Sequence, residues 1–472
     1  GKLSSAGLKA PLNVDTVVTS DGVKARLNGS IANLKAVDGI AMALTAEADS
    51  LQKLGRLAGK PMQGQEPIKL KGNFSASQKT YQVAGLHLEM GELDVKGEAA
   101  FKQPTNGGRP RLAADIHVGV LDLYPGVAKA EQPDQEKESG AAGEGKKSVK
   151  AATENEDLIP PDPEERVGVD SAESKKLFPA DPLPFDTLRG MDVDVDLTVA
   201  KLKTGLIGMI EIEDLVASVT LDNGVLRLSP LQAKIGDGTM NGEASLDARN
   251  SPAVLSADLN VSDGSFRNFG GRLNIETDLD GRGDSVAAIM ASLDGHFEVD
   301  IKNVTMKKNF MTNFGTGLLE SINPFDKEQE ETELLCMIAL FEINDGVADA
   351  RRKIAAQMPD VTWFGGGKID FNTERIAFSF KPKTRKLLDV GVGGIAGLID
   401  IGGTLAEPGL RFDVLDAAVK YGKYTAHMLT GGLTLVADIA WSKIQANQDV
   451  CAAILEHLEE LEEEAAEGDE EE

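Results

Sequence analysis

Hydrophobic and polar side chains alternate along residues 191–199, MDVDVDLTV. The hydrophobic side chains take every second position, at Met191, Val193, Val195, Leu197 and Val199. A period of two is typical of a β-strand that buries one face and leaves the other in water. Any fold of this chain must therefore find a place for the hydrophobic face of this strand.

The polar face of the same segment contains Asp192, Asp194 and Asp196, which form a D-x-D-x-D string. A calcium loop of this type needs a glycine at its sixth position and a glutamate at its twelfth, where this chain has Leu197 and Lys203. Side chains two apart on a strand also lie about 6.6 Å from each other, which is long for carboxylates that share one cation. We interpret the aspartates as the solvated face of a strand and expect no metal site.

Similar alternation recurs along most of the chain and predicts a mainly β protein. Residues 215–228, LVASVTLDNGVLRL, predict a hairpin whose Asn223-Gly224 turn supplies two positive-φ positions. Hydrophobic residues at helical spacing predict only short helices, at 49–58 and 285–293.

A segment that differs from the strands divides the chain. Residues 124–184 are charged and rich in Pro, Gly and Ser, with too few large hydrophobic residues to offset the entropy cost of ordering. After Asp413 the spacing becomes helical, and the chain ends in an acidic run. We expect five segments: β-strands with a short helix at 1–123, a disordered linker or loop at 124–184, a β domain at 185–411, helices at 412–461 and an acidic tail at 462–472.

The charge balance excludes several classes of partner. The 472 residues contain 49 Lys and Arg against 76 Asp and Glu, a net charge of −27. Binding to nucleic acid requires basic patches that neutralise phosphates, so we expect no nucleic-acid partner. Attachment to an anionic membrane surface by charge alone is excluded for the same reason. The sequence also lacks a run of apolar residues long enough to cross a membrane as a helix.

No pattern typical of an enzyme occurs in the sequence. The histidines are scattered, at His87, His117, His296, His427 and His457. Neither a nucleophile elbow nor a phosphate-binding loop is present, and we interpret Gly365-Gly366-Gly367 as turn or bulge glycines. A pair of carboxylates of the glycosidase type stays open, because acidic residues are plentiful. We expect no catalytic residue, no cofactor and no metal.

Two arrangements accommodate the hydrophobic strand faces. In a closed sandwich, two sheets pack these faces against each other. In a single curved sheet, the hydrophobic face forms a trough that hydrocarbon chains can fill. Composition alone favours the sandwich, because large exposed apolar patches are rare on soluble proteins.

Several segments, in their order along the chain, resemble the AsmA family of Gram-negative envelope proteins. They are GLHLEMGELDVKGEAAF, PFDTLRGMDVDVDLTVAKLKTG, LVASVTLDNGVLRLSPLQAKIGDGTMNGEASLDAR, GDSVAAIMASLDGHFEVDI, CMIALFEINDGVADA, GGGKIDFNTERIAFSFKPKTRK and IDIGGTLAEPGLRFD. The resemblance implies an elongated, curved antiparallel sheet with a hydrophobic groove. It also implies non-enzymatic movement of phospholipid between the inner and outer membranes, and a role in outer-membrane biogenesis and integrity.

The resemblance also implies a location and partners. The expected location is the periplasm, with an inner-membrane anchor near the N-terminus of the full-length protein. The chain begins at Gly1, so we expect a fragment or a processed form without that anchor. The expected partners are phospholipid acyl chains, the inner membrane, and outer-membrane or envelope proteins. The alternative function is a structural adaptor, in which a closed β-sandwich binds envelope-assembly partners.

Specific residues follow from this hypothesis. We expect a concave lipid groove lined by Val193, Val195, Leu197, Val219, Leu221, Leu226, Leu228, Leu259 and Val261. The residues alone leave Cys336 and Cys451 either as a disulfide in an oxidising compartment or as two thiols in the cytosol. The periplasmic location implied by the resemblance favours the disulfide.

Overall fold

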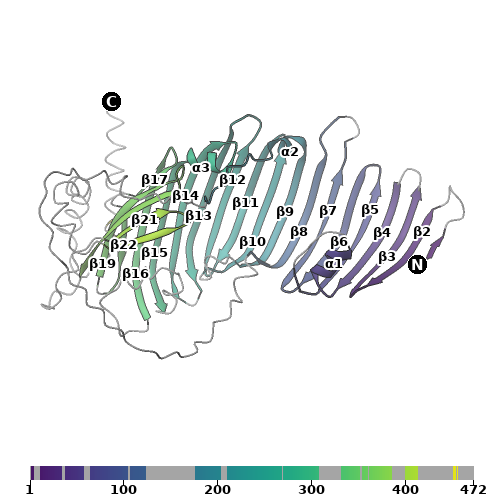
Figure 1. Cartoon of the computed structure of the whole chain (residues 1–472), viewed down its shortest axis with the longest axis horizontal. Helices are drawn as coiled ribbons and strands as arrows, with labels where there is room; N and C mark the ends of the chain where they lie inside the picture. The colour runs from purple at the N-terminus through teal and green to yellow at the C-terminus, as the bar shows by residue number, and fades with distance from the viewer. Residues whose placement is uncertain are drawn as a thin grey trace, which may run out of the picture.

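In the computed structural model, most of the described residues belong to one long sheet (Figure 1). The described residues are 2–4, 11–33, 38–57, 64–104, 107–123, 176–203, 210–267, 269–307, 331–350, 353–359, 361–384, 399–412, 450–452 and 454. All 22 described strands belong to this single sheet. The fold class predicted from the alternation and the resemblance is therefore confirmed.

The strands and helices occur in the following order along the chain. The first half contains β1 (Lys2–Ser4), β2 (Leu12–Ser20), β3 (Val23–Asn33), β4 (Asp38–Ala48), α1 (Leu51–Leu57), β5 (Ile68–Ser77), β6 (Thr80–Met90), β7 (Leu93–Lys102) and β8 (Arg111–Asp122). The middle contains α2 (Phe185–Gly190), β9 (Asp192–Lys203), β10 (Ile212–Asp222), β11 (Val225–Ile235), β12 (Gly238–Asp247), β13 (Ala253–Phe266), β14 (Gly270–Gly283), α3 (Val286–Ala291) and β15 (Asp294–Lys307). The last part contains β16 (Glu331–Asn344), β17 (Val347–Asp349), β18 (Ile354–Gln357), β19 (Val361–Asp370), β20 (Arg375–Thr384), β21 (Ile399–Thr404) and β22 (Pro408–Phe412).

Neighbouring strands pair in antiparallel fashion, with one exception. β8 and β9 pair in parallel, from Arg111 opposite Asp192 to Asp122 opposite Lys203. A parallel pair cannot be joined by a tight turn and needs a long crossover connection. The predicted linker 124–184 is this connection. Its first part, 124–175, lies outside the described residues, whereas 176–184 lie along one edge of the sheet.

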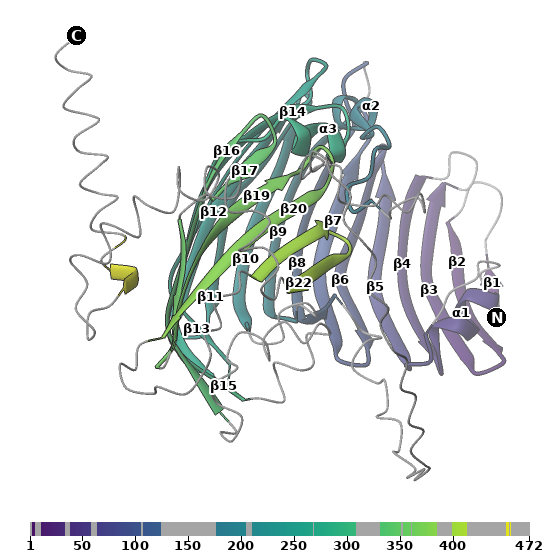
Figure 2. The ribbon, with the colours of Figure 1, turned by 60° about the vertical axis from the view of Figure 1, so that its left-hand side comes forward.

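The sheet is elongated and curved. Figure 1 shows the strands side by side along the long axis, and Figure 2 shows the C-terminal strands turning back in front of the middle of the sheet. The turn-back begins after β15, where β16 pairs with two short strands, β17 and β18, in place of one long strand.

The local predictions for the hairpin and the short helices are confirmed. β10 and β11 form the predicted hairpin, and its Asn223-Gly224 turn has φ values of 50° and 78°. α1 lies within 49–58 and α3 within 285–293. The side chain of Ser285 accepts a hydrogen bond from the backbone N–H of Ala288, which caps the N-terminus of α3.

Two groups of strands repeat the same irregularities. The β6–β7 ladder shifts register between Val83 and Leu86, and the β11–β12 ladder shifts between Leu228 and Leu231. These positions are separated by the same 145 residues in the sequence. Bulges at matching places bend a sheet in matching ways, so β4–β8 and β9–β13 are two similar units joined by the parallel pair.

The C-terminal region is described only in part. Residues 450–452 and 454 are helical, within the predicted helical segment 412–461. Residues 413–449 and the acidic tail 462–472 lie outside the described residues. Among the described helices, none has the length and hydrophobicity to cross a membrane.

Candidate functional site: the inner face of the sheet

The nine residues expected to line a groove lie on one face of the sheet. Val195 is opposite Val219, which in turn is opposite Leu228. Val193, Leu221 and Leu226 form the next row in the same way. Directly opposed residues in a sheet project their side chains to the same side. Through β12, this face continues to β13, where Leu259 opposes Gly242 and Val261 opposes Met240.

The same face continues across the parallel junction into the first half of the chain. One row of successive cross-strand partners runs from β5 to β9, through Leu70, Leu88, Val95, Val118 and Val199. The alternation in β8 that creates this continuity is visible in the sequence. Sequence reasoning did not include these residues, because it did not predict that β8 pairs with β9.

This face lies on the concave side of the curved sheet, and we call it the inner face. Phe341 on β16 and Phe378 on β20 belong to it, and their ring centroids are 6.2 Å apart. In a flat sheet, strands three places apart are separated by about 14 Å. The rings meet because the sheet bends toward the side on which they project.

The exposure of the nine residues is uneven. Seven of them are half-buried, although no second sheet is present among the described strands. The two exceptions are Leu221, which is 3% exposed, and Val261, which is 2% exposed. Val261 packs in a buried cluster with Ala233, Ile235 and Met240. These two side chains therefore contribute to local packing and do not form open surface in this structure.

The two-sheet sandwich that composition favours is absent from the described part of the chain. Side chains of the inner face are partly shielded by their neighbours and by the curvature. Toward the N-terminal end the shielding is weakest, since Val18 is 45% and Leu27 is 36% exposed. Among the described strands, this long apolar surface is thus shielded only in part, and no second sheet packs against it.

The opposite, outer face contains the aspartates of β9. Arg109 Nε donates a hydrogen bond of 2.7 Å to Asp192, and Arg111 Nε donates one of 2.7 Å to Asp194. Ser218 Oγ donates to Asp196 at 2.6 Å. Partial burial acts to raise the pKa of Asp192, but the hydrogen bonds from Arg109 and the Asn223 backbone outweigh it and lower the pKa. Asp192 therefore stays ionised, and the three aspartates form the polar side of the strand.

The outer face also has a shallow hollow of about 440 Å³ over β7–β10. Its lining includes Lys96, His117, Thr198 and Val216. His117 Nδ1 lies 2.5 Å from Thr198 Oγ1, and Lys96 donates to Asp94, so the polar groups largely satisfy one another. Among the described residues, no group of three or more His, Cys, Asp or Glu is placed to hold a metal ion.

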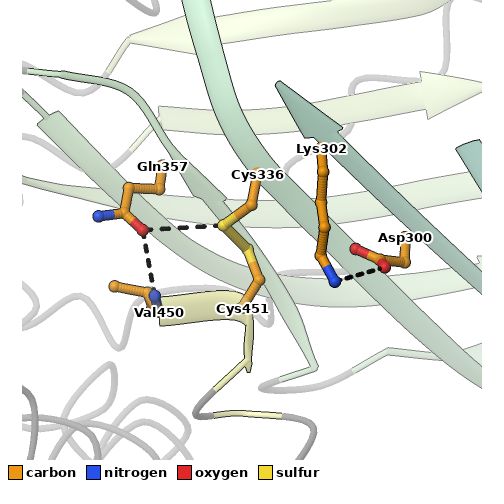
Figure 3. The surroundings of a disulfide bond; sticks show 6 residues. All are labelled: Asp300, Lys302, Cys336, Gln357, Val450 and Cys451. Atoms are coloured by element: carbon orange, nitrogen blue, oxygen red, sulfur yellow. Dashed lines mark hydrogen bonds and ion pairs between the residues drawn. A yellow bond between two sulfur atoms is a disulfide. The ribbon is translucent and has the colours of Figure 1, made fainter. Parts of the chain in front are cut away.

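Cys336 and Cys451 are joined by a disulfide (Figure 3). Cys336 projects from the outer face of β16, and the helical residues around Cys451 cover a small apolar patch there. The patch contains Ile338 and Ala355, which are 0% and 1% exposed. Gln357 Oε1 accepts a hydrogen bond of 3.1 Å from the backbone N–H of Val450, which adds a second attachment (Figure 3).

Sequence comparisons relate the chain to known proteins. The chain is 23% identical to the AsmA family protein YhjG of Escherichia coli (strain K12), over 97% of this chain. The match covers 65% of the length of that relative, so the chain spans somewhat less than two thirds of it. A comparison with solved structures found no match. A family model described as the AsmA family matches residues 30–352, and the chain thus belongs to the AsmA family.

Proposed function

We propose that this chain forms part of a non-enzymatic conduit that carries phospholipids between the inner and outer membranes. Membership of the AsmA family suggests a role in envelope-associated lipid transport or assembly. The observation that carries the proposal is the continuity of the inner face. Half-buried aliphatic side chains cross the β8–β9 junction in three neighbouring rows, Leu112–Val193, Ala114–Val195 and Ile116–Leu197, and the next row, Val118–Val199, is buried.

The dimensions of the inner face suit several lipids at once. From β2 to β13 there are eleven intervals between strands, which at about 4.8 Å each give about 50 Å. Each CH₂ group removed from water on this surface contributes about 0.8 kcal/mol. A lipid is then held by many small contributions, and its movement along the sheet does not require a strong polar contact to break.

The proposal also assigns a place to the lipid headgroups and a role to the outer face of the sheet. Polar headgroups remain in water at the ends of the strands, while acyl chains lie on the inner face. The ion-paired outer face keeps the long sheet soluble and disfavours edge-to-edge aggregation. The proposed location is the periplasm, an oxidising compartment in which a disulfide such as Cys336–Cys451 persists. In the full-length protein, an N-terminal segment anchors it to the inner membrane.

The first test is the amount of phospholipid that co-purifies with the protein from the periplasm of a Gram-negative host. Val195→Arg combined with Leu228→Arg places two charges on the inner face, and we expect about tenfold less bound phospholipid by mass spectrometry. The matched control is Thr220→Arg with Ser256→Arg, on the outer face of the same region, where Asp194 and Asp280 are the cross-strand partners.

The control pair should leave the lipid content unchanged. A lipid-free wild-type protein, or equal lipid in both pairs of variants, contradicts the conduit. A lipid-free protein that retains a specific envelope-assembly partner supports the adaptor instead.

A further inference from the structure

The inner face is closed at its C-terminal end. The large hydrophobic side chains of this face that are exposed lie on β2, β3 and β6, at Val18, Leu27 and Tyr81, whereas Trp363 on β19 is 4% exposed. Three buried clusters fill the face between β14 and β20, and a fourth lies on β11–β13. The described strands nearer the N-terminus have only short buried rows, such as Val23, Ala48 and Ile68. The surface available to a hydrocarbon chain therefore ends before the sheet does.

Aromatic rings fill the closed end. Phe297 contacts Phe341 with ring centroids 6.1 Å apart, Phe341 contacts Phe378 at 6.2 Å, and Phe378 stacks on Phe380 at 6.3 Å. Such contacts add to the free energy of burial when rings are offset or edge-to-face. These rings occupy the space over the sheet that acyl chains would fill elsewhere.

Two glycines of β19, Gly365 and Gly367, make this ring packing possible. A Cβ atom on Gly365 would lie 2.3 Å from Cδ1 of Phe380, and one on Gly367 would lie 2.5 Å from Cδ1 of Phe378. The interpretation of Gly365-Gly366-Gly367 as turn or bulge residues is wrong, since they lie inside β19. Their missing side chains leave room for the rings of β20 to reach across toward β16.

One segment from outside the sheet holds this end in place. Residues 176–184, called the strap, end the crossover between β8 and β9. The carboxylate of Glu374, at the β19–β20 turn, accepts hydrogen bonds from the backbone N–H groups of Leu177 at 2.5 Å and Phe178 at 3.2 Å. Phe178 also packs edge-on against Phe371 at 6.2 Å.

The strap is then fixed to the middle of the sheet. Pro182 forms a β-bridge with Ser285, and the Leu183 N–H donates to the carbonyl of Asp284 at 2.9 Å. Phe185, at the start of α2, is buried with Ala248 and Ala253. The strap thus connects the turn of the C-terminal hairpin to the edge of β12–β14.

Glu374 is an unusual residue for its place in the turn. Its side chain is 3% exposed. Its backbone φ is +59°, a value that residues other than Gly, Asn and Asp seldom adopt. A buried carboxylate needs partners, and the strap supplies two N–H donors. Backbone strain of this kind persists only where the surrounding structure holds it, and here the contacts with the strap do so.

We propose that the β19–β20 hairpin is a gate at the C-terminal end of the acyl-binding face, and that the strap keeps it closed through Glu374. This inference rests on the proposed function. Hydrocarbon chains bind along β2–β13 and stop at the rings of Phe297, Phe341 and Phe378. Release of the strap lets the hairpin move away and extends the acyl-binding face to β20.

The test uses a photo-crosslinking amino acid at Leu228 or at Phe378, and phosphatidylethanolamine with radiolabelled acyl chains. In the otherwise wild-type protein we expect cross-linking at Leu228 and only background at Phe378. Glu374→Ala removes two charge-assisted hydrogen bonds, and cross-linking at Phe378 should then rise about tenfold while that at Leu228 stays constant. Glu374→Gln, which retains one acceptor, should give an intermediate increase, and Glu98→Ala on β7 is the matched control.

Hydrogen exchange provides a measurement that does not depend on lipid. Glu374→Ala should lower the protection of β20 and leave that of β5–β8 unchanged, which also shows that the variant is folded. Equal labelling of Phe378 and Leu228 in the wild-type protein overturns the gate. So does unchanged labelling at Phe378 in both Glu374 variants. Background labelling at both positions in every variant contradicts the proposed function itself, and the gate with it.

Discussion

At the residue scale, two glycines show how the inner face is shaped. Gly97 on β7 and Gly242 on β12 are separated by 145 residues and occupy equivalent places in the two similar units. A Cβ on Gly97 would lie 2.2 Å from the backbone oxygen of Asp115, and one on Gly242 would lie 2.8 Å from that of Asp258. The neighbouring strand approaches closely at both points because no side chain separates them.

We expect Gly242→Ala to lower the free energy of unfolding by about 1–3 kcal/mol, because the added methyl group must push the β13 backbone away. Urea denaturation measures the change. The control is Gly402→Ala on β21, where the nearest atom to a Cβ is 3.9 Å away. Equal effects of the two substitutions would contradict the close approach.

An ion pair on the outer face predicts a pH dependence. Hydrogen bonds from the side chain and the backbone of Arg249 lower the pKa of Asp247 from 3.8 to about 2. Because the pKa is lower in the folded state, this stabilisation is fully present above about pH 4 and is lost as the pH falls toward 2. Asp247→Asn should therefore lose less stability than the wild-type protein between about pH 5 and pH 2.

Thermal unfolding across this pH range measures the difference, with Asp237→Asn at an exposed turn as the control. If Asp247→Asn and the wild-type protein lose the same stability on acidification, the ion pair does not contribute to the fold.

The alternation of hydrophobic and polar residues predicted which side chains share the inner face. It did not predict which of these side chains are buried. All nine expected groove residues share a face, because a period of two fixes the side to which each residue projects. Leu221 and Val261 are buried because of packing with neighbouring strands, which alternation does not encode. Their assignment to a lipid groove stays a prediction, as does that of the other seven.

At the element scale, local sequence signals predicted the hairpin, α1 and α3. The parallel β8–β9 pair was not predictable, since its partners are separated by a segment whose sequence contains no strand signal. The strap was missed for a related reason. Its hydrogen bond from Leu177 to Glu374 joins residues 197 positions apart in the sequence. No sequence periodicity relates these two residues.

The disulfide belongs to this scale because it attaches a helical element to the sheet. It closes a sequence separation of 115 residues, and loss of a bond of this kind lowers stability by about 2–5 kcal/mol. We expect Cys336→Ser with Cys451→Ser to have this effect and to expose the patch around Ile338. Urea unfolding and binding of a hydrophobic dye measure the two consequences.

Treatment of the wild-type protein with a reductant should reproduce the stability of the double variant, and the reductant should leave the variant unchanged. A wild-type protein whose unfolding midpoint is insensitive to reductant would show that the bond does not hold the helical residues against β16.

At the scale of the whole molecule, the central feature is one curved sheet, and among the strands that the structure describes no second sheet packs against its apolar side. The sequence supports this architecture through alternation and family resemblance, while composition alone points to a sandwich. The prediction from composition is wrong because the amino-acid content of a chain does not determine whether a second sheet packs against the first. Buried clusters fill this side between β14 and β20, where the rings of the C-terminal strands pack against one another.

Strand β9 allows the most direct measurement of lipid contact. A photo-crosslinking amino acid is placed in turn at six successive positions and the protein is incubated with a phospholipid that has labelled acyl chains. The positions are Val193, Asp194, Val195, Asp196, Leu197 and Thr198. The conduit predicts strong labelling at the three hydrophobic positions and background labelling at the three polar ones between them. Uniform labelling, or none at any of the six, would contradict an acyl-binding inner face.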